Sequence, residues 1–452
     1  MKLKLLFLVT ILPLALFQCT QEKKARYHAP IDLSCEEATD STYSLESYRY
    51  VHESLSLGMP VNSISYLSCF LPNENIDKKP DELLETFMAN VFNADVLYEY
   101  LEDTYDDLIQ RDDKGGREGG FAWLGFHAAS ASVIAYQQTR EKRFIDQYIT
   151  FFNKVMDRRD SKKGITDDYH GKTMNSWGSY HFGDDKWVSM ITHFAIIMQP
   201  ATSVSYLIQT DSTLAEYSGF KDEILAYFKP AYVEFDVDIR QAQNTEEKWY
   251  WRPIEEKFEA TNHIHLLGHT LVNMYKITGD EFYADRIRWI IRVFEKGVMI
   301  DEDGLIAWNY HPYLQVEEAM SNHNAQFYSE KVWKAGLTIP FLYEAEEAGF
   351  LINPDIISAT TKTIREHVVA NNTFASNLHP RESMPIEEDS HLKRADNQEF
   401  ITMFLIAAKK DPEIAQRIKT IIATHPKLYE NGWLTKLMSR GYAHFLEAKP
   451  IN

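Results

Sequence analysis

The feature that most constrains the fold is a helical pattern that recurs along the chain from Pro80 onward. Apolar residues return at the three- and four-residue spacing of α-helices, and each apolar helix is followed by a short turn and a second, amphipathic helix. The turns carry equivalent positions that lie 71, 68, 70 and 62 residues apart, namely Thr139, Thr210, Thr278, Ala348 and Lys410. A helical hairpin that returns at this interval predicts either an open solenoid or a closed ring.

The contrast between the two helices of each unit favours the ring. The first helix is apolar on nearly every side, as in 264–275, whereas the second carries charged residues among its apolar ones, as in 286–295. A helix that is apolar all round is expected inside, and a helix with one apolar face is expected outside. We therefore predict an all-α protein with little β structure, an (α/α) toroid of about five to seven helical hairpins over residues 80–452. In such a ring, the loops before the inner helices meet at one mouth.

The first 19 residues predict an export signal. Lys2 and Lys4 precede an apolar run that is short for a membrane span and ends at Cys19. The segment resembles a bacterial lipoprotein signal, which implies a lipid on Cys19 and an anchor in the cell envelope, on the periplasmic or surface side of the outer membrane. An ordinary cleaved signal peptide is the alternative. Residues 20–79 are expected to form a tether and an irregular N-terminal segment.

Export and charge together limit the partners. In an oxidising compartment, Cys35 and Cys69 are expected to form a disulfide, with two buried thiols as the alternative. The chain has 47 Lys and Arg against 66 Asp and Glu, a formal net charge of −19. Sequence-independent nucleic-acid binding requires clustered cations, so we expect no nucleic-acid partner. We expect a monomer.

Aromatic and polar residues are concentrated in the loops before the predicted inner helices. Indole and phenol faces stack on sugar rings, and their polar groups bond to sugar hydroxyls, so these loops predict glycan binding. Aromatic packing within long loops is the alternative. The expected sugar platforms and substrate contacts are Trp177, His193, Trp251, Trp308, Tyr313 and His323.

A family resemblance enters at the head of one inner helix. Asn262 and His263 stand there, and Asp303-Gly304 and Tyr310 follow one hairpin later. This arrangement resembles polysaccharide lyases of the alginate-lyase type. The resemblance implies an (α/α) toroid that cuts an acidic, uronic-acid polysaccharide by β-elimination. It also implies that Asn262 and His263 hold the substrate carboxylate and that Tyr310 moves the protons.

The chemistry explains why such residues are needed. Proton removal beside a carboxylate creates an enolate-like charge, which positioned amide and imidazole donors stabilise. An unperturbed tyrosine has a pKa of about 10, so a nearby cation must favour its phenolate before it acts as a base. Arg252 is the expected cation. His311 stands beside Tyr310, where the family pattern would have an arginine.

Two other functions remain open. A glycoside hydrolase on a similar toroid would use paired carboxylates, for which the candidates are Asp167, Asp168, Glu255, Glu256, Glu259 and Glu318. A non-catalytic surface lipoprotein would hold glycans through its tryptophans. Asn322-His323 repeats the Asn-His pair, and the alternative role for both copies is to cap helices. The chain shows no serine-nucleophile elbow, phosphate loop or dinucleotide fingerprint.

We expect no cofactor and no catalytic metal. His265 and His269 share a helix face, but the glutamate that follows the first histidine in zincins is missing. A structural divalent cation could bind at 301–303, where Asp301, Glu302 and Asp303 adjoin.

Overall fold

The computed structural model describes residues 94–113, 119–242, 246–252, 254–312, 330–350, 353–372, 374–380 and 399–424. The predictions for residues 1–79 lie outside these ranges. They include the lipid on Cys19 and the disulfide between Cys35 and Cys69. Tyr313, Glu318 and His323 also lie outside.

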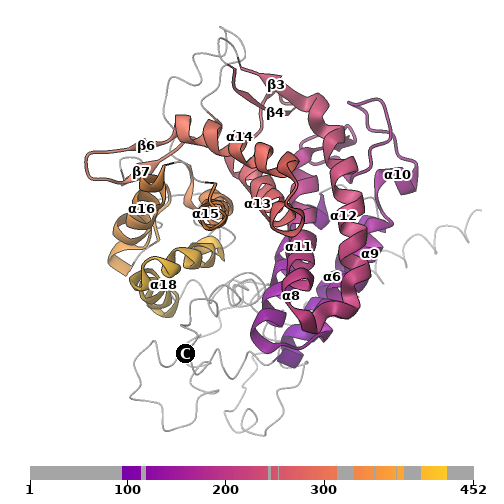
Figure 1. The fold of residues 1–452 in the computed structure, drawn as a ribbon, viewed down its shortest axis with the longest axis horizontal. Helices are drawn as coiled ribbons and strands as arrows, with labels where there is room; N and C mark the ends of the chain where they lie inside the picture. Colours follow the sequence, from indigo (N-terminus) through magenta and orange to yellow (C-terminus); the bar gives the residue numbers. More distant parts are fainter. Residues whose placement is uncertain are drawn as a thin grey trace, which may run out of the picture.

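Five successive helices form an inner layer within the described residues. They are α8 (Gly125–Thr139), α11 (Ile191–Thr210), α13 (Thr261–Thr278), α15 (Val332–Glu347) and the 3-10 helix η8 (Glu399–Lys409). Each packs against the next in chain order. Figure 1 shows them following an arc from α8 through α13 to α15, with α18 beyond.

An outer helix backs each inner one. These are α9 (Arg143–Met156), α12 (Ser218–Val233), α14 (Glu281–Gly297), α16 (Pro354–Thr363) and α18 (Pro412–Thr424), and α6 (Ala94–Asp113) packs on α8 and α9. The amphipathic pattern explains the position, since helices such as α14 bury Ile287, Ile291 and Phe294 and expose charged residues. The predicted (α/α) toroid is confirmed.

The predicted turns also lie where the sequence places them. Helices α8, α11 and α13 end at Thr139, Thr210 and Thr278. Gly279 closes α13 with φ of 65°, a left-handed conformation that costs glycine little. Helix α13 begins at Thr261, and Ala260 occupies the N-cap position without a side-chain bond. The Thr261 hydroxyl donates to the Asn309 carbonyl at 3.2 Å and so joins the start of α13 to the loop after β7.

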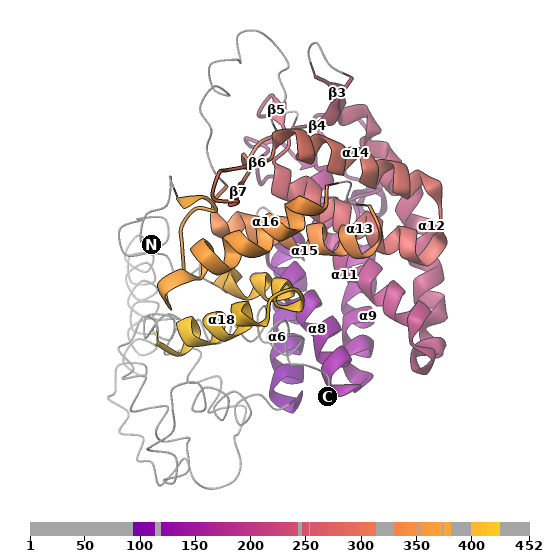
Figure 2. The same ribbon diagram turned by 60° about the vertical axis from the view of Figure 1, so that its left-hand side comes forward.

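Short antiparallel strands stiffen the loops that lead into the inner helices. They are β1 (Gly178–Ser179) with β2 (Val188–Ser189), β3 (Ile239–Gln241) with β4 (Lys248–Arg252) and β5 (Lys257–Phe258), and β6 (Met299–Ile300) with β7 (Ile306–Ala307). The register pairs Ile239 with Tyr250 and Trp251 with Phe258. Figure 2 shows β3 to β7 gathered at one end of the helices, which is the mouth of the ring.

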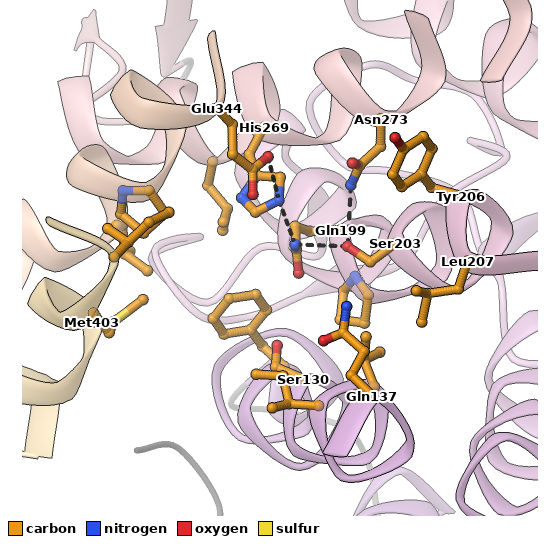
Figure 3. Close-up of a pocket in the computed structure, with 18 of the residues that line it drawn as sticks. Ser130, Gln137, Gln199, Ser203, Tyr206, Leu207, His269, Asn273, Glu344 and Met403 are labelled. Carbon is orange, nitrogen blue, oxygen red and sulfur yellow. Dashed lines mark hydrogen bonds and ion pairs between the residues drawn. The ribbon is translucent and has the colours of Figure 1, made fainter. Parts of the chain in front are cut away.

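The axis of the ring contains a cavity of about 320 Å³ that residues from all five inner helices line. Figure 3 shows its polar side chains pointing inward. Helix α11, which contributes Gln199, is long and apolar enough by composition to cross a membrane, with a mean hydropathy of 1.2. Of the apolar stretch of this helix, 83% is buried inside the protein, as is typical of a core helix.

Candidate functional site

A second cavity, of about 400 Å³, lies at the mouth of the ring. Its walls come from α7 (Gly120–Trp123), α8, α11, α13, α15 and the loops before α11 and after β7. The lining residues are Ala122, Trp123, Phe126, His127, His181, Phe182, Ile196, Asn262, His263, Leu266, Tyr310, Trp333, Lys334 and Leu337.

Asn262, His263 and Tyr310 therefore meet at one cavity, as the sequence predicts. The first two stand in the first turn of α13, and the backbone carbonyl of Tyr310 accepts the Thr261 amide at 2.8 Å, which fixes the loop to the helix. The rings of His263 and Tyr310 lie 6.4 Å apart. Asn262 is 2% exposed, and its Oδ1 has no hydrogen-bond partner. A buried acceptor without a partner is costly, so this oxygen is a natural contact for a ligand donor.

A buried carboxylate fixes the His263 ring. Nδ1 of His263 lies 2.8 Å from Oε1 of Glu259, which leaves Nε2 as the ring nitrogen for the cavity. Burial lowers the pKa of His263, and the Glu259 bond only partly opposes it. The ring is therefore neutral at pH 7, with Nδ1–H donating to the carboxylate and Nε2 able to accept a proton.

Arg252 is the charge partner of that carboxylate. Its guanidinium bonds to Glu259 and lies 2.5 Å from Oε1 of Glu255. Burial alone would raise the pKa of Glu259, but the Arg252 charge and the His263 bond hold it well below its usual range. Arg252 is 4% exposed and does not line the cavity. Its charge acts on the Tyr310 phenol, as expected, but less strongly than burial does. Arg252 also positions Glu259 and, through it, His263.

Tyr310 holds its proton. Burial raises the pKa of Tyr310, and the opposing effect of Arg252 is smaller. Lys334 lies over the phenol ring, with Nζ 3.4 Å from the centroid, a cation–π arrangement. A protonated phenol can donate a hydrogen bond or a proton, but it is not a ready base at neutral pH.

Trp123 is the aromatic wall that sequence reasoning missed. Its indole N–H donates to Nε2 of His193 at 3.0 Å, and Nδ1 of His193 lies 3.3 Å from the Ser179 hydroxyl. Burial lowers the pKa of His193 to about 3, so this histidine stays neutral and orients Trp123. His193 does not line the cavity, so the prediction that it contacts the substrate directly is corrected. The Gly119-Gly120 pair before α7 was the available signal for this position.

Phe182 and Trp333 complete the aromatic surface. Phe182 has φ of 63°, which is strained for a residue with a side chain, and it is 36% exposed. The Arg252 guanidinium lies 4.9 Å from its ring. Aromatic rings on several sides of a mainly apolar pocket with a few polar groups are typical of sugar sites.

The three tryptophans that were expected to stack on sugars do not line the cavity. Trp177 and Trp308 are 4% and 1% exposed, so neither can stack on a sugar. Trp177 donates to the Val155 carbonyl at 2.8 Å, and Trp308 donates to Glu330. Trp251 is half-buried against the edge of Phe258 and does not line the cavity. These three expectations are wrong because each indole is used in packing.

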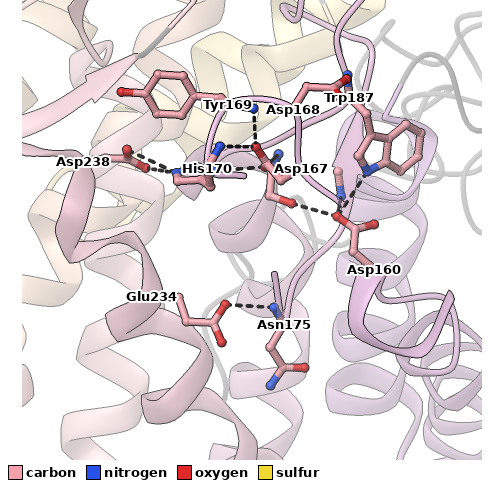
Figure 4. A network of polar contacts seen from close by, with 11 residues as sticks. Asp160, Asp167, Asp168, Tyr169, His170, Asn175, Trp187, Glu234 and Asp238 are labelled. Atoms are coloured by element: carbon pink, nitrogen blue, oxygen red, sulfur yellow. Dashed lines mark hydrogen bonds and ion pairs between the residues drawn. The ribbon is translucent and has the colours of Figure 1, made fainter. Parts of the chain in front are cut away.

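A buried polar network holds the loop that carries Phe182 (Figure 4). Oδ2 of Asp160 accepts from the Gly178 amide, the Trp187 indole and the Ser189 hydroxyl at 2.9 to 3.1 Å. Burial raises the pKa of Asp160 to about 6.

The neighbouring Asp167, one of the predicted catalytic carboxylates, binds backbone amides and the ring of His170. His170 in turn lies 3.0 Å from Asp238. Asp167 thus holds a loop together and does not face the cavity.

The other predicted carboxylate pairs do not flank the cavity either. Asp168 is exposed and accepts the Trp187 amide, and Glu255 and Glu259 are bound to Arg252. Among the described lining residues there is no Asp or Glu. The described residues therefore do not place a pair of carboxylates at this cavity.

The described residues contain no cluster of three His, Cys, Asp or Glu side chains that could hold a metal. His265 is buried between the rings of Phe294 and Phe341, and His269 pairs with Glu344 at 3.0 Å. Asp301 accepts two backbone amides of its own turn and contacts His379.

No family model matches the chain, and no curated protein matches it. In overall shape it is similar to solved structures of a family 76 α-1,6-mannanase from Salegentibacter sp. HEL1_6. An inactive variant in complex with α-1,6-mannotetrose shares 11% identity at a TM-score of 0.46, and the match covers 79% of this chain and 99% of that one. A family 76 mannosidase from Bacteroides thetaiotaomicron shares 12% identity at a TM-score of 0.34, over 69% of this chain and 70% of that one.

The expectation of a polysaccharide lyase is corrected here. The similar solved structures are named as glycoside hydrolases. The site itself also lacks the tyrosine base on which that expectation depended, since Arg252 is neutralised by two glutamates and the pKa of Tyr310 is raised.

Proposed function

We propose that this chain is a glycoside hydrolase that binds a polysaccharide or oligosaccharide in the cavity at the mouth of the ring. The observation that carries the proposal is the neutral His263, fixed by Glu259 and turned to a cavity that also holds the protonated Tyr310. The aromatic faces of Trp123, Phe182 and Trp333 support binding of a sugar chain.

The proposed reaction needs one base and one acid. Nε2 of His263 removes a proton from a water molecule, whose oxygen attacks the anomeric carbon. Tyr310 gives its phenol proton to the glycosidic oxygen as the bond to that oxygen breaks. The proton on His263 then returns to Tyr310 through solvent, so atoms and charges balance. Glu259 stabilises the imidazolium that forms, as a buried carboxylate does for a catalytic histidine.

An acidic sugar is the substrate class we propose. Lys334 lines the cavity and has Nζ above the Tyr310 ring. Burial lowers the pKa of Lys334, and Glu330 only partly opposes this. A carboxylated sugar beside Lys334 would restore the charge balance and would place the neighbouring glycosidic bond near Tyr310 and His263.

The location of the protein remains a proposal from its first 19 residues. We propose export and a lipid on Cys19, which would hold the ring at the cell envelope near extracellular glycans. Labelling cells with a radioactive fatty acid tests this, since the label should appear on the parent chain and be absent from Cys19→Ser. Equal labelling of both chains would contradict the anchor.

Cleavage in water enriched with heavy oxygen tests the reaction. Purified protein is incubated with neutral and uronate-containing polysaccharides, and the masses of the products are measured by mass spectrometry. A hydrolase places one heavy oxygen at each new reducing end. An intact polymer, or products without the heavy oxygen, would overturn the proposal.

Two variants and one control locate the chemistry. His263→Gln and Tyr310→Phe should lose turnover by about 100-fold or more, which is the usual contribution of general acid–base catalysis. Tyr169→Phe, on an exposed tyrosine of the 160–190 loop, removes the same hydroxyl away from the cavity and should keep full activity. Full activity in His263→Gln would remove this histidine from the mechanism.

A further inference from the structure

The cavity on the ring axis lies at the opposite end of the inner helices from the mouth. The two cavities adjoin at Phe126, Leu266 and Leu337, three apolar residues that line both of them. From there the axial cavity extends to Lys276, Glu347 and Lys409 near the C-terminal ends of α13, α15 and η8. Glu347 and Lys409 are exposed, so the cavity opens at the turn side of the ring.

Inner helices α11, α13 and α15 join in a chain of polar contacts along one wall. Nδ2 of Asn273 donates to the Ser203 hydroxyl at 3.1 Å, and Nε2 of Gln199 lies 3.1 Å from the same hydroxyl. The Gln199 amide also lies 3.0 Å from His269, which pairs with Glu344 at 3.0 Å. Figure 3 shows this row of side chains on the cavity wall.

The carbonyl oxygen of the Gln199 side chain takes no part in this row of contacts. Gln199 is 7% exposed, and its Oε1 has no hydrogen-bond partner. In Figure 3 this atom points away from the row and toward α8. A buried amide group without a partner costs free energy, whereas one that meets a ligand hydroxyl is satisfied.

The charges of the cavity define the ligand class. Lys276 and Lys409 stand with Glu344 and Glu347, and Lys409 pairs with Glu347 at 3.3 Å. The two positive and two negative charges cancel, so the cavity attracts an anionic ligand only weakly. The lining mixes amides and hydroxyls with apolar surface, and the volume of about 320 Å³ is at the small end of ligand sites. Neutral sugars carry many hydroxyls and apolar C–H faces, which matches this lining.

We propose that the axial cavity is a second ligand site, which binds a neutral mono- or disaccharide. One hydroxyl of the sugar donates a hydrogen bond to Oε1 of Gln199. Sugar binding there does not depend on catalysis at the mouth, because the polar residues that line the axial cavity do not line the mouth cavity.

Saturation-transfer NMR on the full chain tests the site. The probes are glucose, galactose, mannose, N-acetylglucosamine and their disaccharides, at millimolar concentration. Ser130→Phe places a ring in the cavity from α8, where Ser130 is a half-buried lining residue. Ser218→Phe makes the same change on the exposed start of α12 and is the control.

We expect at least one sugar to bind the parent chain, with affinity at least ten-fold weaker in Ser130→Phe and unchanged in Ser218→Phe. Binding should also persist in Trp123→Ala, which damages only the mouth. The site is refuted if no sugar binds, or if binding survives Ser130→Phe. Loss in Trp123→Ala alone would assign the sugar to the mouth.

If Ser130→Phe does not fold, a second variant keeps the test decisive. Ser130→Cys is folded first and then blocked with a small thiol reagent, which fills the same space. The parent chain treated with the reagent is its control. Binding that is equal in both would overturn the proposal.

Discussion

Glu330 is a buried acid whose charge state makes stability depend on pH. It is 0% exposed, it accepts from the Trp308 indole, and its Oε1 has no hydrogen-bond partner. Burial raises the pKa of Glu330 to about 8, and the Trp308 bond and Lys334 only partly oppose this. The folded protein therefore keeps a proton on Glu330 at neutral pH, whereas the unfolded chain has released it.

The sign and size of the effect follow from this difference. An acid with a raised folded pKa contributes stability that is fully present below its unfolded pKa and is lost as pH rises through its folded pKa. Each pH unit in that window costs about 1.4 kcal/mol. Between pH 5 and pH 7.5, the free energy of unfolding should fall by about 3 kcal/mol on account of this group.

Glu330→Gln removes the titrating proton and keeps the shape. An amide oxygen can still accept from Trp308, so we expect equal stability of parent and variant near pH 5. At pH 7.5 the variant should be more stable by about 3 kcal/mol, measured by urea unfolding at both pH values. Glu223→Gln, on the exposed face of α12, is the matched control and should show no such trend. A stability difference between Glu330→Gln and the parent that is the same at both pH values would refute the reasoning.

Three further outcomes are expected. Tyr310→Phe should bind glycan with unchanged affinity while kcat falls by about 100-fold or more, so an equal loss of affinity would argue against a role as proton donor. Glu259→Gln should lower the free energy of unfolding by about 3 kcal/mol, because Arg252 then stays buried with half of its charge partners; an unchanged unfolding midpoint in urea would contradict this. Gly268→Ala should lower the melting temperature, because its Cβ would lie 2.5 Å from the Phe341 ring. The cost of such overpacking is about 1–3 kcal/mol, and a neutral result in calorimetry would count against the packing.

The fold could be predicted from local patterns because its unit is local. Each hairpin is a contiguous stretch, and the period of its apolar residues sets which face is buried. The turns at Thr139, Thr210 and Thr278 end helices in the structure as they do in the pattern. The small strands at the mouth were not predicted, because pairings of two or three residues are too short to show a period in the sequence.

The site could be predicted only in part. Asn262 and His263 were found because they stand at the start of an inner helix, and Tyr310 because it lies in the loop before the next one; a ring brings such positions together. Trp177 and Trp308 were misplaced because the sequence does not say whether an indole faces solvent or the core. Lys334 was missed because nothing in its neighbourhood separates it from ordinary helical residues, and Trp123 was missed because the glycine pair before it does not show that an indole faces the cavity.

By itself, the amino-acid sequence determined the helices, their order and their inner or outer position, because periodicity acts over neighbouring residues. Only the tertiary structure decided which charges meet. It bound Arg252 to Glu259, turned one nitrogen of His263 to the cavity and raised the pKa of Tyr310. Those outcomes depend on burial and on distances between distant segments, which follow only once the chain has folded.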